Sequence, residues 1–211
     1  MYKSLFLLCF SLLTALSCFA QSTDSLPLDP SMSPREVRRV KKLFSQATYP
    51  LLKTHIMTGV MPVQDIDVRP DTSLNYPLLF SWTLPANDSV KSKRANSGLT
   101  EIGRIINLHI ANGIPLNHLQ VEVVVHGLSL FSLLNDDAYQ KQFHRSNPNA
   151  ALVREMQAAG VHFQACGQAM AFLGLDKKDL MQGIDKALTA QTMISYYQIK
   201  GYVLYNEDKE D

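Results

Sequence analysis

Cysteine is scarce in this chain of 211 residues, which has only Cys9, Cys18 and Cys166. Long apolar runs are also lacking, since the run from Leu5 to Leu16 is shorter than the roughly 20 residues that a membrane-spanning helix needs. Neither sign of charge dominates, with 20 Lys and Arg residues against 19 Asp and Glu. These absences argue against a membrane span and against electrostatic binding of nucleic acid.

Several catalytic and binding motifs are missing as well. The sequence has no Walker loop, no G-x-G-x-x-G, no G-x-S-x-G and no H-E-x-x-H, so nothing supports nucleotide binding or serine hydrolysis. The histidines His109, His118, His144 and His162 show no metal-ligand spacing with each other or with Cys166. We therefore predict neither a metal site nor a cofactor.

The first 20 residues have the pattern of a signal peptide. Lys3 supplies a positive charge, Leu5 to Leu16 form the apolar region, and Cys18-Phe19-Ala20 resembles a cleavage site. Cleavage between Ala20 and Gln21 would make the protein periplasmic or secreted. In an alternative interpretation, Leu16-Ser17-Cys18 is a lipoprotein site, and a lipid on Cys18 would anchor the chain to a membrane.

Removal of the signal peptide leaves Cys166 as the single cysteine, so no intramolecular disulfide can form. It also removes Lys3 and no acid, which balances the charge at 19 basic and 19 acidic residues. An apolar fraction of 46% with 18% charged residues is typical of a globular protein that can bury a core.

The remaining chain divides into three parts. Residues 21–75 form a linker, an N-terminal helix from Pro34 to about Ala47 and an irregular extension. Residues 76–206 form an α/β domain, and residues 207–211 form a charged tail. Within the domain, the pattern predicts strands at 77–83, 119–126, 161–166 and 202–206, and helices at 98–112, 128–143, 149–159, 176–179 and 189–200. This alternation predicts a single α/β domain with a mostly parallel sheet.

Cys166 is the main candidate for chemistry. It ends a predicted strand, and Gly167-Gln168 begin the helix that follows. Ligands bind at this edge of open α/β sheets, and the amides of a helix N-terminus favour a thiolate. The alternative is that Cys166 is a small hydrophobic residue of the core.

His126 is the second candidate, because it ends the Val-rich strand and would emerge at the same edge as Cys166. There it could accept the thiol proton or, when protonated, stabilise the thiolate. Alternatively, it only caps the next helix or bonds to the backbone. Besides catalytic Cys166 and His126, we predict four ligand-binding residues, of which Asn147 is also explained as a helix cap and Gln168 as a first-turn polar residue. The four are Gly127, Asn147, Gly167 and Gln168.

Four segments together resemble the DsrE/DsrF-like family, and more narrowly its exported, largely uncharacterised branch. They are Val121–Gly127, Asn147–Asn149, Ala159–Gln168 and Ala187–Tyr202. The resemblance implies a single-domain, three-layer α/β sandwich with a mostly parallel five-stranded sheet, and a homo-oligomer, either a trimer or a hexamer. Characterised members of the family relay sulfur as a persulfide on a cysteine that Cys166 matches, which implies sulfur donor and acceptor proteins as partners.

Three functions remain open at this stage. The first is a thiol-based sulfur carrier that uses Cys166, with His126 and the Gly167 and Gln168 amides assisting. The second is a non-enzymatic oligomeric module that binds a small ligand and uses Cys166 only for packing. The third is a redox sensor or intermolecular disulfide, because a single thiol can pair across a symmetric interface.

Overall fold

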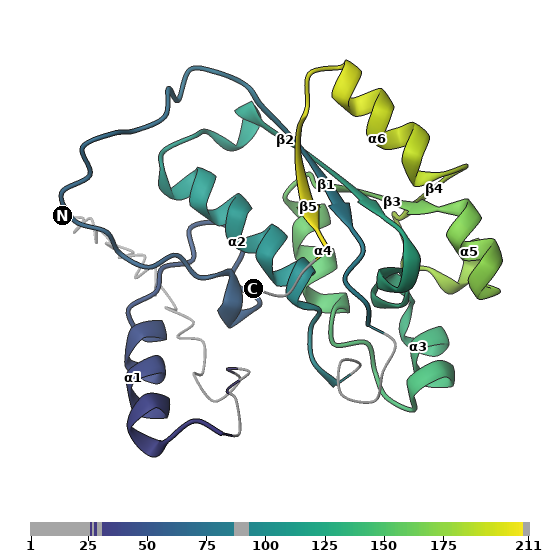
Figure 1. Cartoon of the computed structure of the whole chain (residues 1–211), viewed down its shortest axis with the longest axis horizontal. Coiled ribbons are helices and arrows are strands. Elements are labelled where there is room, and N and C mark those ends of the chain that lie inside the picture. The colour runs from purple at the N-terminus through teal and green to yellow at the C-terminus, as the bar shows by residue number, and fades with distance from the viewer. Residues whose placement is uncertain (1–25, 27, 29–30, 87–92, 209–211) are drawn as a thin grey trace, which may run out of the picture.

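The computed structural model describes residues 26, 28, 31–86 and 93–208 (Figure 1). The predicted signal peptide, its cleavage site and the alternative lipid on Cys18 lie outside these residues. The strands are β1 (Tyr76–Trp82), β2 (Leu119–Val125), β3 (His162–Cys166), β4 (Asp185–Ala187) and β5 (Val203–Glu207). The α-helices are α1 (Pro34–Phe44), α2 (Ser97–Ala111), α3 (Asp136–Phe143), α4 (Ala150–Ala158), α5 (Gly167–Leu173) and α6 (Ala190–Ile199). Short 3₁₀ helices are η2 (Ile56–Thr58), η4 (Leu116–His118), η5 (Gly127–Leu133) and η6 (Lys177–Asp179).

The five strands form one sheet in the order β4-β3-β2-β1-β5, and every pairing is parallel. The apolar runs of β1 and β2 lie near the middle of this sheet and are buried on both faces over their last five residues. Continuous burial of this kind is what a parallel sheet covered by helices requires. The predicted α/β class and five-stranded parallel sheet are confirmed.

Side chains that alternate along each strand divide the sheet into two faces. Phe80, Val123 and Phe163 belong to a large core, to which α2 and α4 also contribute. Their neighbours in the sequence, Leu79 and Val124, point to the other face of the sheet and pack with α6. In Figure 1, α2 and α6 lie on opposite sides of the strands. The molecule is therefore a three-layer sandwich with unequal outer layers.

The order of the strands explains why α6 lies apart from the other helices. From β1 to β4 the chain adds strands in one direction, and it then returns past them to place β5 beside β1. Because crossovers between parallel strands are right-handed, the reversal carries α6 to the other face. The connections that follow β3 and β4 thus diverge, since α5 buries Met170 in the large core and α6 covers the opposite face. Ligands bind in such sheets at the point of divergence.

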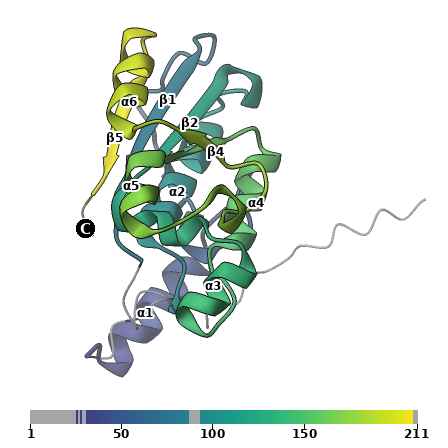
Figure 2. The same cartoon turned by 90° about the vertical axis from the view of Figure 1, so that its right-hand side faces the viewer.

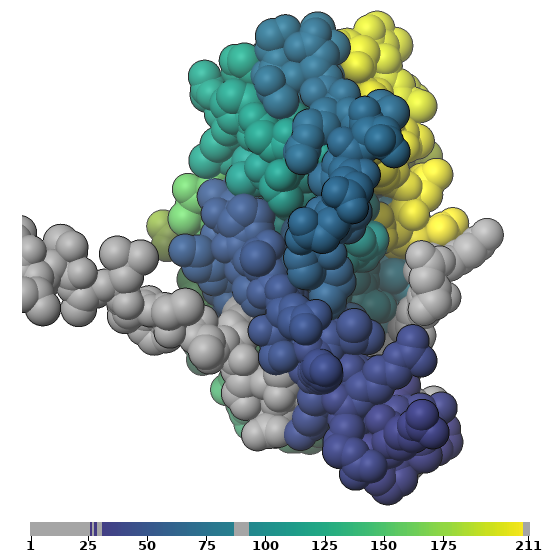
Figure 3. All heavy atoms as spheres, turned by 90° about the vertical axis from the view of Figure 1, so that its left-hand side faces the viewer, coloured from purple at the N-terminus to yellow at the C-terminus, as the bar shows by residue number. Residues whose placement is uncertain are grey.

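The segment before β1 is pinned to the large-core side by the buried side chain of Asn107 on α2. Its Oδ1 accepts the amides of Leu51 and Leu52, at 3.2 and 2.9 Å. Its Nδ2 donates to the carbonyl oxygens of Leu52 and Thr58. Gly103 permits this close approach, because a Cβ there would lie 2.7 Å from the Thr58 methyl group. Figure 3 shows the segment crossing the surface between α1 and the domain.

Two features of the fold differ from the sequence predictions. The single helix predicted over 128–143 is instead the 3₁₀ helix η5 followed by α3, since Leu134 is extended and bridges to Leu180. Asn135 then starts α3 by accepting the amide of Ala138. The residue pattern did not reveal β4, because its three residues are largely exposed and lack an apolar alternation. Within the described residues, no helix has the length and apolar character needed to cross a membrane.

Candidate functional site

Cys166 lies at the end of β3, on the face that α6 covers. Its side chain packs with Leu79, Val124, Ala190 and Tyr197, and only 4% of the residue is exposed. It is the one cysteine beyond residue 20, and its thiol is free. The sequence prediction of a cysteine at the carboxyl edge of the sheet is therefore correct, and the sulfur lies beneath the surface there.

The sulfur of Cys166 faces the N-terminus of α6. The amide of Ala190, the first residue of that helix, donates to Sγ at 3.2 Å. This amide belongs to the first turn, whose N–H groups have no partner within the helix and carry the positive end of its dipole. The sulfur therefore occupies the point where the connections after β3 and β4 diverge. Figure 2 views the molecule from the side of the edge strand β4.

The turn between β4 and α6 is held against the residues that follow the cysteine. The amide of Gln168 donates to the carbonyl oxygen of Leu188 at 3.1 Å. A Cβ on Gly167 would lie 2.7 Å from the carbonyl oxygen of Ala187, so only glycine fits without displacing this backbone. Gly167 thus positions the turn that brings Ala190 to the sulfur.

These contacts correct one sequence prediction. The Gln168 amide was expected to face the sulfur, but it is occupied by Leu188, and its side chain is exposed. The amide that does reach the sulfur, that of Ala190, was missed. The sequence predicts a helix that starts at Thr189, but it does not predict β4. Pairing of β4 with β3 is what places the start of that helix beside Cys166.

His126 continues β2 by one residue and lies at the level of Cys166. Its backbone is extended, and its amide donates to the Trp82 carbonyl oxygen at 3.1 Å. Because Val125 pairs with Ala165, His126 and Cys166 are the next residues on neighbouring strands and share the α6 face. The sequence prediction that the two residues meet at one edge agrees with this register.

The imidazole of His126 nevertheless turns toward β1. Its Nε2 lies 3.0 Å from the hydroxyl oxygen of Ser81, a partner that the sequence did not suggest. Among the described residues, the only hydrogen bond to the Cys166 sulfur comes from Ala190. Burial lowers the pKa of His126, so the ring is neutral at neutral pH. In that form it can accept a proton.

Gly127 shapes the turn after His126, with a φ of +66° that favours glycine. The hydroxyl of Ser129 fastens this turn by donating to the carbonyl oxygens of Trp82 and His126, at 2.8 and 2.7 Å. His126 is therefore held at a defined position, with its ring on the same side of the sheet as the sulfur.

Asn147 lies away from the cysteine, among the segments on the large-core side. Its Nδ2 donates to the carbonyl oxygens of Ser132 and Leu134, and its Oδ1 accepts both the backbone and the side-chain N–H of Asn149. The side chain is buried and all of its hydrogen-bonding capacity is in use. The geometry gives Asn147 a structural role and not contact with a ligand, but the N-cap of α4 is Asn149, so the helix-cap interpretation of Asn147 is wrong as well.

A buried polar cluster fastens α6 to the sheet. The hydroxyl of Tyr197 donates to Glu122 at 3.0 Å, and Gln164 donates to the same carboxylate at 2.9 Å. The ring of His162 lies 3.2 Å from the other carboxylate oxygen. Burial, together with the neighbouring carboxylate, raises the pKa of Tyr197 to about 12, so its hydroxyl remains a hydrogen-bond donor.

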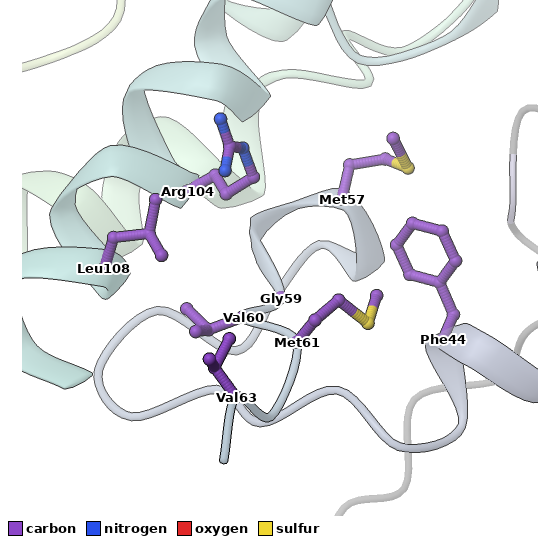
Figure 4. Close-up of a pocket in the computed structure, with 8 residues that line it drawn as sticks. All are labelled: Phe44, Met57, Gly59, Val60, Met61, Val63, Arg104 and Leu108. Carbon is purple, nitrogen blue, oxygen red and sulfur yellow. The ribbon is translucent and has the colours of Figure 1, made fainter. Parts of the chain in front are cut away.

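A separate cavity lies on the opposite side of the molecule. It measures about 340 Å³ and is lined by apolar residues of α1, α2 and the segment between them, with Arg104 at one side (Figure 4). Cys166 and His126 do not line it. Across the part of the chain that the structure describes, no three His, Cys, Asp or Glu side chains are grouped so that they could hold a metal ion.

This chain is similar to a solved structure and matches the model of a protein family. A protein of unknown function from Methanobacterium thermoautotrophicum has a solved structure that matches with 22% sequence identity and a TM-score of 0.47, over 63% of this chain and 99% of that one. No curated protein matches. The family model described as DsrE/DsrF-like matches residues 95–205, which is more than half of the sequence. The chain therefore belongs to the DsrE/DsrF-like family.

Proposed function

We propose that this protein is a thiol-based sulfur carrier that holds sulfur as a persulfide on Cys166. The observation that carries the proposal is the Ala190 amide directed at the sulfur from the first turn of α6. A helix N-terminus stabilises an anion, and the thiolate is the reactive form of cysteine. Membership of the DsrE/DsrF-like family suggests a sulfur-relay role and agrees with this chemistry.

Loading is a thiol exchange in which no net oxidation occurs. The Cys166 thiolate attacks the terminal sulfur of a donor persulfide, so a new S–S bond forms at Sγ as the S–S bond of the donor breaks. The donor leaves as a thiolate, and the transferred sulfur keeps its own proton. Transfer to an acceptor thiol is the same exchange in reverse.

His126 would take the proton of the Cys166 thiol before attack. Its ring shares the α6 face with the sulfur, and burial lowers its pKa, so it is unprotonated at neutral pH and free to accept a proton. The hydrogen bond to Ser81 limits how the ring can turn. Ser81 would then act as a positioning residue for the proton acceptor.

Access to the sulfur requires a small movement, because Cys166 is only 4% exposed. The residues directly over it belong to the turn between β4 and the start of α6. Local opening of this turn would admit a donor while Tyr197 keeps the other half of α6 on the sheet. We expect reactivity to depend on this opening.

The test is incubation of the full chain with a low-molecular-weight persulfide, followed by mass spectrometry of the proteolytic peptide that contains Cys166. The expected product is that peptide carrying one additional sulfur atom, removable by a thiol acceptor. Cys166→Ser provides the blank. His126→Gln is expected to slow loading about 100-fold, the low end of what a positioned proton acceptor contributes. A Cys166 peptide that stays unmodified would refute the proposal.

A second candidate function also has an observation in its favour. The side chain of Cys166 is buried in a small apolar cluster with Leu79 and Val124, which suits a structural cysteine in an oligomeric module that binds a small ligand. In that case iodoacetamide would label the folded protein far more slowly than the unfolded chain, and Cys166→Ser would leave ligand binding unchanged. Rapid labelling of the folded protein would exclude it. The same burial argues against an intermolecular disulfide.

We also propose a homo-oligomer, either a trimer or a hexamer. Large apolar side chains are exposed on α5, on α6 and just before α6, where Phe172 is 90%, Ile199 86% and Leu188 75% exposed. Large apolar side chains that are this exposed are candidates for contact residues between subunits. Light scattering coupled to size-exclusion chromatography would give the mass, and Phe172→Glu with Ile199→Glu should produce a smaller species.

Export remains part of the proposal, on the basis of the sequence of residues 1–20. N-terminal sequencing of protein recovered from the periplasm or medium should begin at Gln21. A mature chain beginning at Cys18 would instead identify the lipid-anchored alternative. Retention of Met1 in the cytoplasm would contradict both.

A further inference from the structure

Helix α1 carries a row of cations along one side. Arg35, Arg38, Arg39 and Lys42 follow the i, i+3, i+4, i+7 spacing that places residues on a single helix face. All four are exposed. In the described part of the chain none of them is in an ion pair. We call these four residues the cationic stripe.

The cationic stripe faces away from the rest of the protein. Three apolar residues of α1, Val37, Val40 and Phe44, follow the opposite side of the helix and are partly buried. Phe44 lines the cavity together with Met57 and Met61, as Figure 4 shows. In Figure 3, α1 forms a projection at one end of the molecule, well away from the sheet. The helix is thus attached by its apolar side and presents its charge outward.

The one acid of α1 does not neutralise the stripe. The carboxylate of Glu36 accepts the backbone and hydroxyl hydrogen bonds of Ser33, at 2.8 and 2.7 Å, in a capping box. These bonds hold the pKa of Glu36 below its usual value, so it remains charged and engaged at the cap. Five basic residues therefore stand against one acid in a helix of 11 residues, while the whole chain has a net charge of only +1.

We propose that α1 docks the protein onto anionic phospholipid surfaces through the cationic stripe. A straight row of charges on one helix suits a flat, negatively charged surface, and the net negative charge of the remaining chain would orient the molecule with α1 toward it. Two further apolar side chains, Met32 just before the helix and Leu43 within it, are 36% and 45% exposed and can enter the headgroup region. Duplex nucleic acid fits less well, since the pI of the chain is about 7.7 rather than basic.

The test is co-sedimentation of the full chain with phosphatidylcholine vesicles, prepared with and without phosphatidylglycerol. Binding is expected only to the anionic vesicles and should weaken as salt is raised. Arg38→Gln with Arg39→Gln should reduce affinity about 25-fold, because each basic residue near an anionic surface contributes roughly a fivefold factor. The matched control is Lys141→Gln with Arg154→Gln, which removes the same charge from exposed sites on α3 and α4 and should leave affinity unchanged.

Three outcomes would overturn this proposal. The first is a lack of binding to anionic vesicles, and the second is equal binding to both kinds of vesicle, which would assign the interaction to an apolar leader or lipid. The third is an equal loss of affinity in the control pair. Binding of duplex DNA as tightly as anionic vesicles at the same salt would reassign the stripe to nucleic acid. The thermal midpoint of each variant, measured without vesicles, should match that of the parent.

Discussion

The two faces of the sheet are built in different ways. On one face, α2, α4 and α5 bury a continuous core that includes Phe80, Trp82 and Phe163. On the other, α6 covers a cluster of five buried residues, and hydrogen bonds among Tyr197, Gln164 and Glu122 reinforce it. The candidate thiol belongs to the second face. The difference teaches that most of the buried apolar core lies on one face while the candidate thiol lies on the other, where we expect local opening to require less free energy.

The largest expected effect on stability comes from the large core. Phe163→Ala, on the large-core face of β3, should lower the free energy of unfolding by about 3–5 kcal/mol, because it removes a fully buried ring and leaves a cavity. Val124→Ala, on the α6 face of β2, removes fewer buried atoms and should lower it less. Urea denaturation of both variants gives the comparison. Equal losses would mean that the two faces contribute alike.

A smaller effect is expected at the point where the α6 turn is held. Gly167→Ala should lower the free energy of unfolding by about 1–3 kcal/mol, because the added Cβ would lie 2.7 Å from the Ala187 carbonyl oxygen and displace the turn. The displacement should also speed iodoacetamide labelling of Cys166. Gln168→Ala, at the next and exposed position, serves as the control and should change neither quantity. Slower labelling of Gly167→Ala would contradict the idea that the close contact between Gly167 and Ala187 controls access to the Cys166 sulfur.

Loss of one hydroxyl should loosen α6 selectively. Tyr197→Phe removes the hydroxyl that donates to Glu122 and should lower the free energy of unfolding by about 1–2 kcal/mol. Hydrogen exchange should rise in α6 more than in α2, and labelling of Cys166 should become faster. Tyr196→Phe is the matched control, since its ring is half exposed on the outer side of the helix. A uniform rise in exchange across both helices would argue against a separate opening of α6.

The smallest effect is expected from pH. Burial lowers the pKa of His126 and of His55, whereas in the unfolded chain each ring takes up a proton near pH 6.5, at about the ordinary value. The unfolded state then binds more protons, so the free energy of unfolding should fall as the pH drops below about 6.5, until the folded-state pKa is reached. His126→Gln should flatten this slope in urea titrations. An unchanged slope would show that His55, on the large-core side, carries the effect.

Much of the fold follows from local pattern. The Val-rich run of β2 and the alternation of β3 identify strands without reference to the rest of the chain, because burial dictates their residue types. Once the sheet is parallel, His126 and Cys166 must emerge at one edge. The candidate pair was predictable from the sequence for this reason.

Other parts of the site depend on contacts between distant residues. β4 forms because Asp185 and its neighbours pair with Gln164 and the end of β3, and its composition carries no trace of that pairing. Ser81 was not suspected because it becomes the partner of His126 only when β1 lies beside β2. The cluster around Glu122 also joins residues that are far apart in the sequence.

The sequence by itself determined the α/β class, the parallel sheet and a single thiol at the end of a strand, because each is a matter of periodicity, residue type or count. Only the tertiary structure decided which helix faces that thiol. The reversal of strand order after β4 brings α6 to the face that Cys166 occupies. The sulfur therefore accepts a hydrogen bond from the amide of Ala190, whereas the amide of Gln168 donates to Leu188. Long-range pairing sets that choice, and local pattern does not record it.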